Sequence, residues 1–130
     1  MNKTIFISGI IFGVLAVILG AFGAHGLEGL VDADAMQTFE TGIRYQMYHA
    51  LMLLILANTD FLPEKAKKAV FCLVVFGIVL FSFSIYLLAT NDLTALDFRK
   101  IALLTPLGGT TLILGWILLG IRVLQKSRFK

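Results

Sequence analysis

The sequence predicts an all-α integral membrane protein, a four-helix transmembrane bundle with the N and C termini in the cytoplasm. Three observations predict this fold: an apolar composition, three long uncharged stretches, and basic residues that gather in alternate segments. Apolar residues make up 58% of the chain and charged residues 15%, whereas soluble proteins average about 45–50% and about 25%. We expect one transmembrane domain over residues 1–130, with spans at about 5–27, 35–58, 68–90 and 101–123.

The first, third and fourth spans are predicted by length and composition alone. Residues 5–24, 69–91 and 101–121 contain no Asp, Glu, Lys or Arg. Each stretch reaches the roughly 20 residues that a helix needs to cross a bilayer core. The first stretch is longer than the 7–15 residues typical of a signal-peptide core, so we expect it to remain as a span.

The second span is less obvious because its apolar part is short. Residues 50–57 form an apolar run that covers only about 12 Å as a helix, against a bilayer core of about 30 Å. The polar sequence 44–49 precedes this run directly. Asp34 and Gln37 resemble a capping box that starts a helix, and Asn58 is a typical helix end. The sequence therefore predicts a full span that carries polar residues to membrane depth.

The distribution of charge predicts the orientation. Basic residues gather at the amino terminus, between the second and third spans, and at the carboxyl terminus: Lys3, Lys65, Lys67, Lys68, Arg122, Lys126, Arg128 and Lys130. With four spans, all of these segments are cytoplasmic, as the positive-inside rule requires; with three spans, one cluster lies outside. The net charge of +3 therefore relates to topology, and we expect no nucleic-acid partner.

Polar residues gather on about half of the second helix when successive residues are placed 100° apart. Glu40 and Arg44 are spaced to neutralise each other, and Tyr45 and His49 are spaced to hydrogen-bond. With two residues from the end of the first helix they form a candidate polar cluster: His25, Glu28, Glu40, Arg44, Tyr45, Gln46, Tyr48 and His49.

Three interpretations of this cluster remain open. The tyrosines can lie at headgroup level while Arg44 extends its charge to the membrane surface, so that the residues anchor the outer end of the helix. Alternatively, the cluster braces the bundle as a polar network, or it forms a site for a ligand, an ion or a proton.

Small residues predict close helix packing. On the first helix they recur at steps of four and three, and Gly9 and Gly13 form a GxxxG pair. The predicted packing residues are Gly9, Gly13, Ala16, Gly20, Gly23, Gly108 and Gly115. Pro106 predicts a kink in the fourth helix. This pattern does not distinguish packing within the chain from packing in a homo-oligomer or against another membrane protein.

We expect no enzyme activity, catalytic residue, cofactor or metal. His25 and His49 are the only histidines, whereas a zinc or iron site needs three or more protein ligands. Cys72 is the only cysteine, so no intrachain disulfide can form. No uncharged span core contains the carboxylate that small proton-coupled exporters use. A minor transporter or channel, with a crevice lined by Glu40, Arg44, Gln46 and His49, remains the alternative.

Two motifs carry a resemblance to a known family. Residues 20–27 (GAFGAHGL) and 39–51 (FETGIRYQMYHAL) resemble small four-span membrane proteins of the YwdK/YgdD type, an uncharacterised family. The resemblance implies a multi-pass protein of the bacterial cell membrane, with the lipid bilayer as its surroundings, and supplies no activity or site residues. We expect a small structural or accessory membrane protein.

Overall fold

The computed structural model describes residues 1–93 and 97–125, and all regular structure in these residues is helical. The α-helices are α1 (Lys3–Phe22), α2 (Ala33–Ala57), α3 (Glu64–Ile78), α4 (Ser84–Ala89) and α5 (Leu104–Gln125). Two π-helical segments, η1 (Gly23–Leu27) and η2 (Val79–Phe83), extend α1 and join α3 to α4. Two short 3₁₀-helices, η3 (Asn91–Leu93) and η4 (Phe98–Ile101), precede α5.

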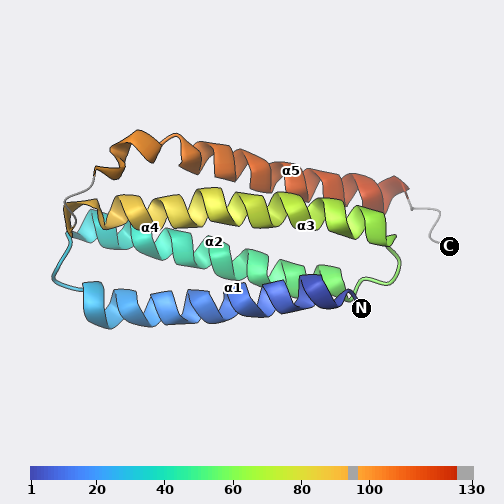
Figure 1. Ribbon diagram of the computed structural model, residues 1–130, viewed down its shortest axis with the longest axis horizontal. Helices are drawn as coiled ribbons and strands as arrows, with labels where there is room; N and C mark the ends of the chain where they lie inside the picture. Colours follow the sequence, from blue (N-terminus) through green and yellow to red (C-terminus); the bar gives the residue numbers. More distant parts are fainter. Residues whose placement is uncertain (94–96, 126–130) are drawn as a thin grey trace.

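The long helical segments lie side by side (Figure 1). The first comprises α1 and η1, the second α2, the third α3, η2 and α4, and the fourth α5; we call these segments rods. The third rod is continuous from α3 through η2 to α4. α1 packs mainly on α2, and α5 packs mainly on α3 and η2. α2 also contacts α3, η2 and α4. The contact between the second and third rods therefore joins the pair α1 and α2 to the pair formed by the third rod and α5.

Local sequence explains both ends of α2. Asp32, in an extended conformation (φ −71°, ψ 171°), caps the helix and accepts a hydrogen bond from the Ala35 amide at 2.7 Å. The prediction that Asp34 is the cap was wrong by two residues, because Asp34 already lies in the first helical turn. Asn58 ends the helix, as predicted, and its side-chain amide donates to the Leu54 carbonyl at 2.8 Å.

The start of α5 explains the role of Pro106. The predicted span starts at about residue 101, but Phe98–Ile101 form the 3₁₀-helix η4 and α5 begins only at Leu104. Pro106 therefore lies in the first turn of α5, where backbone amides have no partner within the helix. A missing N–H removes no helical bond there, so the prediction that Pro106 kinks the span was wrong.

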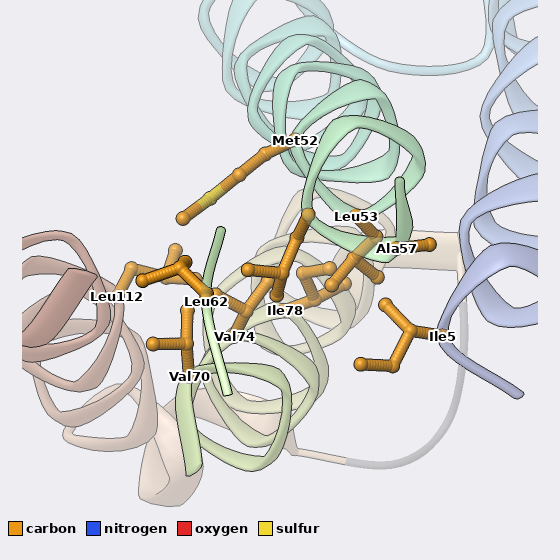
Figure 2. Close-up of a cluster of buried hydrophobic side chains, with 10 residues drawn as sticks. Ile5, Met52, Leu53, Ala57, Leu62, Val70, Val74, Ile78 and Leu112 are labelled. Carbon is orange, nitrogen blue, oxygen red and sulfur yellow. The ribbon is translucent and has the colours of Figure 1, made fainter. Parts of the chain in front are cut away.

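The main apolar core draws side chains from α1, α2, α3 and α5 (Figure 2). Its buried members are Ile5, Met52, Leu53, Leu56, Ala57, Leu62, Val70, Val74, Ile78 and Leu112. A smaller core at the other end of α2 contains Leu27, Phe39, Tyr86 and Ala89. Along α2, the buried polar side chains of Gln46 and His49 lie between Phe39 of the smaller cluster and Met52 of the main core.

Three helical segments in the described part of the chain are long and apolar enough to cross a membrane: Lys3–Leu27, Glu64–Ala89 and Leu104–Gln125. α2 has the length, with 25 residues, but its first half is polar. How α2 places its polar side chains is therefore the central question about this fold.

Candidate functional site: the polar faces of α2

The polar residues of α2 divide between two faces of the helix. Gln46 and His49 are buried, with 0% and 4% of their surface exposed. Glu40, Arg44 and Tyr48 are exposed on another face. The predicted cluster therefore does not form one site, because a helix turns its residues by about 100° per step.

Gln46 links three rods of the bundle. Its side-chain nitrogen donates to the Phe12 carbonyl of α1 at 2.8 Å, and its oxygen accepts from the Tyr86 hydroxyl of α4 at 2.7 Å. Both partners are far from Gln46 in the sequence, so each bond fixes a tertiary contact. Such neutral bonds are strengthened in an apolar interior, where water offers no alternative partner.

Gly42 gives Tyr86 the space that this bond requires. A Cβ atom on Gly42 would lie 2.6 Å from Cε1 of Tyr86. The Gly42 carbonyl also accepts a hydrogen bond from the buried Ser82 hydroxyl of η2 at 2.8 Å. One turn of α2, from Gly42 to Gln46, therefore holds the third rod in place.

His49 links α2 to α5. Its Nδ1 lies 2.6 Å from the Tyr45 carbonyl, and its Nε2 lies 3.0 Å from the indole nitrogen of Trp116. Because an indole N–H only donates, Nε2 must be the acceptor, and the proton must lie on Nδ1. The contacts therefore require a neutral imidazole in the Nδ1–H tautomer.

Two predicted side-chain pairs differ from the structure. Tyr45 and His49 stack their rings, with centroids 6.5 Å apart, and the hydrogen bond runs to the Tyr45 carbonyl rather than to its hydroxyl. Arg44 donates to the Thr41 hydroxyl at 3.2 Å. Among the described residues, Glu64 forms an ion pair with Lys67, but Glu40 and Arg44 do not pair with each other, so the predicted Glu40–Arg44 pair was wrong.

The remaining cluster residues lie on the surface. His25, in η1, and Glu28, directly after it, are exposed. Tyr45 and Tyr48 have 42% and 55% of their surface exposed. A groove of about 230 Å³ runs beside Glu40 and Arg44 and is lined on its other side by Gly20 of α1 and by Gly23 and Ala24 of η1. Gln46 and His49 do not line it.

A second polar contact closes the opposite end of the bundle. The Asn2 side chain donates to Glu64 at 2.6 Å, and its backbone amide donates to the Ala57 carbonyl at 2.9 Å. Glu64 also pairs with Lys67 at 3.2 Å. Lys67 is only 2% exposed, so this pair neutralises a buried cation where the chain enters the third rod.

The predicted packing residues lie mostly at helix contacts within the chain. A Cβ on Gly9 would lie 2.9 Å from the Ala50 carbonyl oxygen, and one on Gly108 would overlap the backbone of Phe81. A Cβ on Gly23 or Gly115 would lie 3.1 or 3.2 Å from Phe39 or Val74, which is also tight, whereas one on Gly13 or Gly20 would make ordinary van der Waals contacts. Ala16 is buried.

Sequence reasoning missed several residues of these two sets of polar contacts: Asn2, Gly42, Glu64, Lys67, Ser82, Tyr86 and Trp116. Ser82 and Tyr86 carried a usable signal, because polar groups four residues apart share one face of an otherwise apolar span. The described residues contain no group of three or more His, Cys, Asp or Glu side chains that could hold a metal ion.

Comparisons with known proteins match most of the chain. Residues 19–109 match a family described as a protein of unknown function, DUF423. The UPF0382 membrane protein YwdK of Bacillus subtilis is 42% identical over 122 residues, which cover 90% of this chain and 93% of that protein. The UPF0382 inner membrane protein YgdD of Escherichia coli is 36% identical over 121 residues, with 91% and 87% covered. No solved structure matches.

Proposed function

The chain belongs to the DUF423 family of proteins of unknown function, and from that premise we propose that it is a four-span protein of the bacterial cell membrane with both termini in the cytoplasm. The resemblance to the YwdK/YgdD type is confirmed by relatives of both names. These relatives and the apolar helices make the chain a membrane protein. The printed name of the Escherichia coli relative, an inner membrane protein, supports the cell membrane as its location.

The packing of α2 supports a fourth span. Its 25 residues extend about 37 Å, enough to cross a bilayer core. It contacts α1 on one side and α3, η2 and α4 on another. Its buried polar side chains are hydrogen-bonded inside the bundle, which is how membrane helices accommodate such groups.

We further propose a structural or accessory role, with no catalysis by this chain. This proposal rests on one observation: the buried polar side chains of the chain join separate rods. Gln46 joins α2 to α1 and α4, Ser82 joins η2 to α2, and His49 joins α2 to α5. The hydroxyls of Ser84 and Thr105, 2.7 Å apart, join α4 to α5. This use of polar groups favours a rigid bundle.

Replacement of Gln46 tests this role. Gln46→Leu should lower the yield of folded, monodisperse protein, because Tyr86 and the Phe12 carbonyl lose their partner. Gln37→Leu is the matched control, since Gln37 is exposed on the same helix. Normal folding of Gln46→Leu would contradict the bracing role.

A minor transporter or channel is the second candidate, favoured by the groove that brings one carboxylate and one guanidinium together at Glu40 and Arg44. Proton flux into vesicles that contain the purified protein, followed with a pH-sensitive dye, separates the two candidates. We expect no flux above that of empty vesicles. Flux that Arg44→Ala abolishes without loss of folding would establish transport instead.

Reporter fusions test the topology independently. A cytoplasm-sensitive reporter should be silent after Asp34 and active after Lys67. Equal signals at the two positions would overturn the four-span arrangement.

A further inference from the structure

One exposed face of α2 carries a continuous row of large and charged side chains. Glu40, Arg44, Tyr48, Leu51 and Ile55 follow at steps of four and three and are all exposed. At about 100° per residue they fall within one quarter of the helix circumference. We call this row the α2 seam.

The α2 seam brings charge to the depth of an uncharged part of α1. A Cβ on Gly20 would lie 3.9 Å from Ile43, and one on Gly23 would lie 3.1 Å from Phe39. Glu40 and Arg44 therefore lie beside the outer end of the uncharged first span. The groove that they line contains Gly20 and Ala24 of that span. Charges exposed to lipid at such depth are unfavourable, yet Glu40 and Arg44 do not pair with each other.

Two apolar grooves flank the α2 seam. On the α1 side, Gly9, Gly13, Met47, Ala50 and Leu54 help to line a groove of about 370 Å³. On the α5 side, Tyr48 and Ile55 of the α2 seam line a groove of about 300 Å³ together with Trp116 and Leu119. The α2 seam is therefore a ridge between two grooves, a shape in which helices interlock.

We propose that the α2 seam is a self-association surface whose partner is the α2 seam of a second copy of this chain. The proposal rests on the four-span topology, since both copies must enter the membrane in the same direction. A two-fold axis along the membrane normal then places the equivalent residues of the two copies at the same depth. The two Glu40 and two Arg44 side chains, one helical turn apart, come together there, so each carboxylate can reach across to a guanidinium of the other copy. Two carboxylates and two guanidinium groups meet with no net charge.

Charge complementarity favours a second copy over lipid as the occupant. An anionic headgroup would neutralise Arg44 but would repel Glu40, which lies one turn away. A second copy supplies both signs in the required spacing. Its apolar residues at positions 51 and 55 can also enter the flanking grooves.

Charge reversal in two differently tagged copies tests the proposal. The tagged wild-type copies should co-purify from detergent. Arg44→Glu should not co-purify with itself, because its surface carries two negative charges, and Glu40→Arg should fail for the opposite reason. A mixture of Arg44→Glu with Glu40→Arg should co-purify, since the charges are complementary only between copies. A charge reversal at exposed Lys68, outside the α2 seam, should leave co-purification unchanged.

Failure of the mixed pair to co-purify, with both variants correctly inserted by the topology reporters, would overturn the proposal and leave the four-span topology standing. Equal reporter signals would instead identify failure of the topology itself.

Cysteine crosslinking gives a second measurement that needs no charge change. In a Cys72→Ser background, Leu51→Cys in the α2 seam should form disulfide-linked dimers in the membrane. Ile113→Cys on α5 should not, although Ile113 and Leu51 are similarly exposed, at 59% and 49%. Equal crosslinking at both positions would indicate random collision and contradict the proposal.

Discussion

The inner and outer faces of α2 use similar residue types for different purposes. On the inner face, Gln46 and His49 meet partners from three other helices at 2.7–3.0 Å. On the outer face, among the described residues, Arg44 donates a side-chain hydrogen bond only to Thr41 of its own helix. One helix thus carries two kinds of polar residue. Those on the inner face find hydrogen-bond partners on other helices of the chain, whereas the charged residues on the outer face do not.

This difference shows why a polar residue in a span cannot be interpreted by type alone. A buried amide in an apolar interior stabilises the fold only when both of its hydrogen-bonding ends are satisfied. An exposed ion at membrane depth instead favours an external partner. Changes on the inner face should therefore affect folding, whereas changes on the outer face should affect association.

The largest effect is expected at Gly42. Gly42→Val places a side chain where Tyr86 lies, since even a Cβ would be 2.6 Å from its ring. Displacement of Tyr86 also breaks its bond to Gln46, so we expect a loss of about 3 kcal/mol or failure to fold. Thermal unfolding in detergent measures this loss. Thr41→Val, at the neighbouring position, is the control and should change stability by less than about 0.5 kcal/mol.

A smaller effect is expected when the Tyr86 hydroxyl is removed. Tyr86→Phe keeps the ring but leaves the Gln46 oxygen without its donor, which should cost about 1–2 kcal/mol. Tyr48→Phe makes the same chemical change on the outer face and should not alter the unfolding temperature. Equal effects of the two changes would contradict the distinction between the faces.

The sequence predicts the helices of this bundle well, because hydropathy, charge and length are local signals. It places the end of α2 at Asn58, and it identifies Gly9 and Gly108 among the small residues that the structure places at close contacts. The predicted fourth span starts at about residue 101, whereas α5 starts at Leu104, since the point at which a helix begins depends on packing as well as on apolarity.

Sequence alone cannot resolve the two faces of α2. Residues 40–49 suggested one broad polar face, and only the contacts with Phe12, Tyr86 and Trp116 show which part is enclosed. These partners lie 34 to 67 residues away, so no local periodicity relates them. The α2 seam is similarly invisible until the buried side of α2 is known.

The link between α2 and α5 should contribute about 1 kcal/mol, less than the Gln46 network, since it contains one interhelical hydrogen bond. Trp116→Phe removes the donor to His49 and should lower the unfolding temperature slightly. Acidification should weaken the same link in the wild-type protein, because a proton on Nε2 would face the indole N–H. If acid lowered the stability of Trp116→Phe as much as it lowers the stability of the wild-type protein, the result would contradict this account.

The smallest effect on folding is expected at Arg44. Arg44→Ala removes only a hydrogen bond to Thr41 within one exposed turn, so the unfolding free energy of the isolated chain should change by less than about 0.5 kcal/mol. Co-purification of two tagged copies should nevertheless fall, because the Glu40 side chains would then face each other without a compensating charge. A large loss of thermal stability would place Arg44 in the inner network. Unchanged stability with lost association would instead separate the two faces of α2 by function.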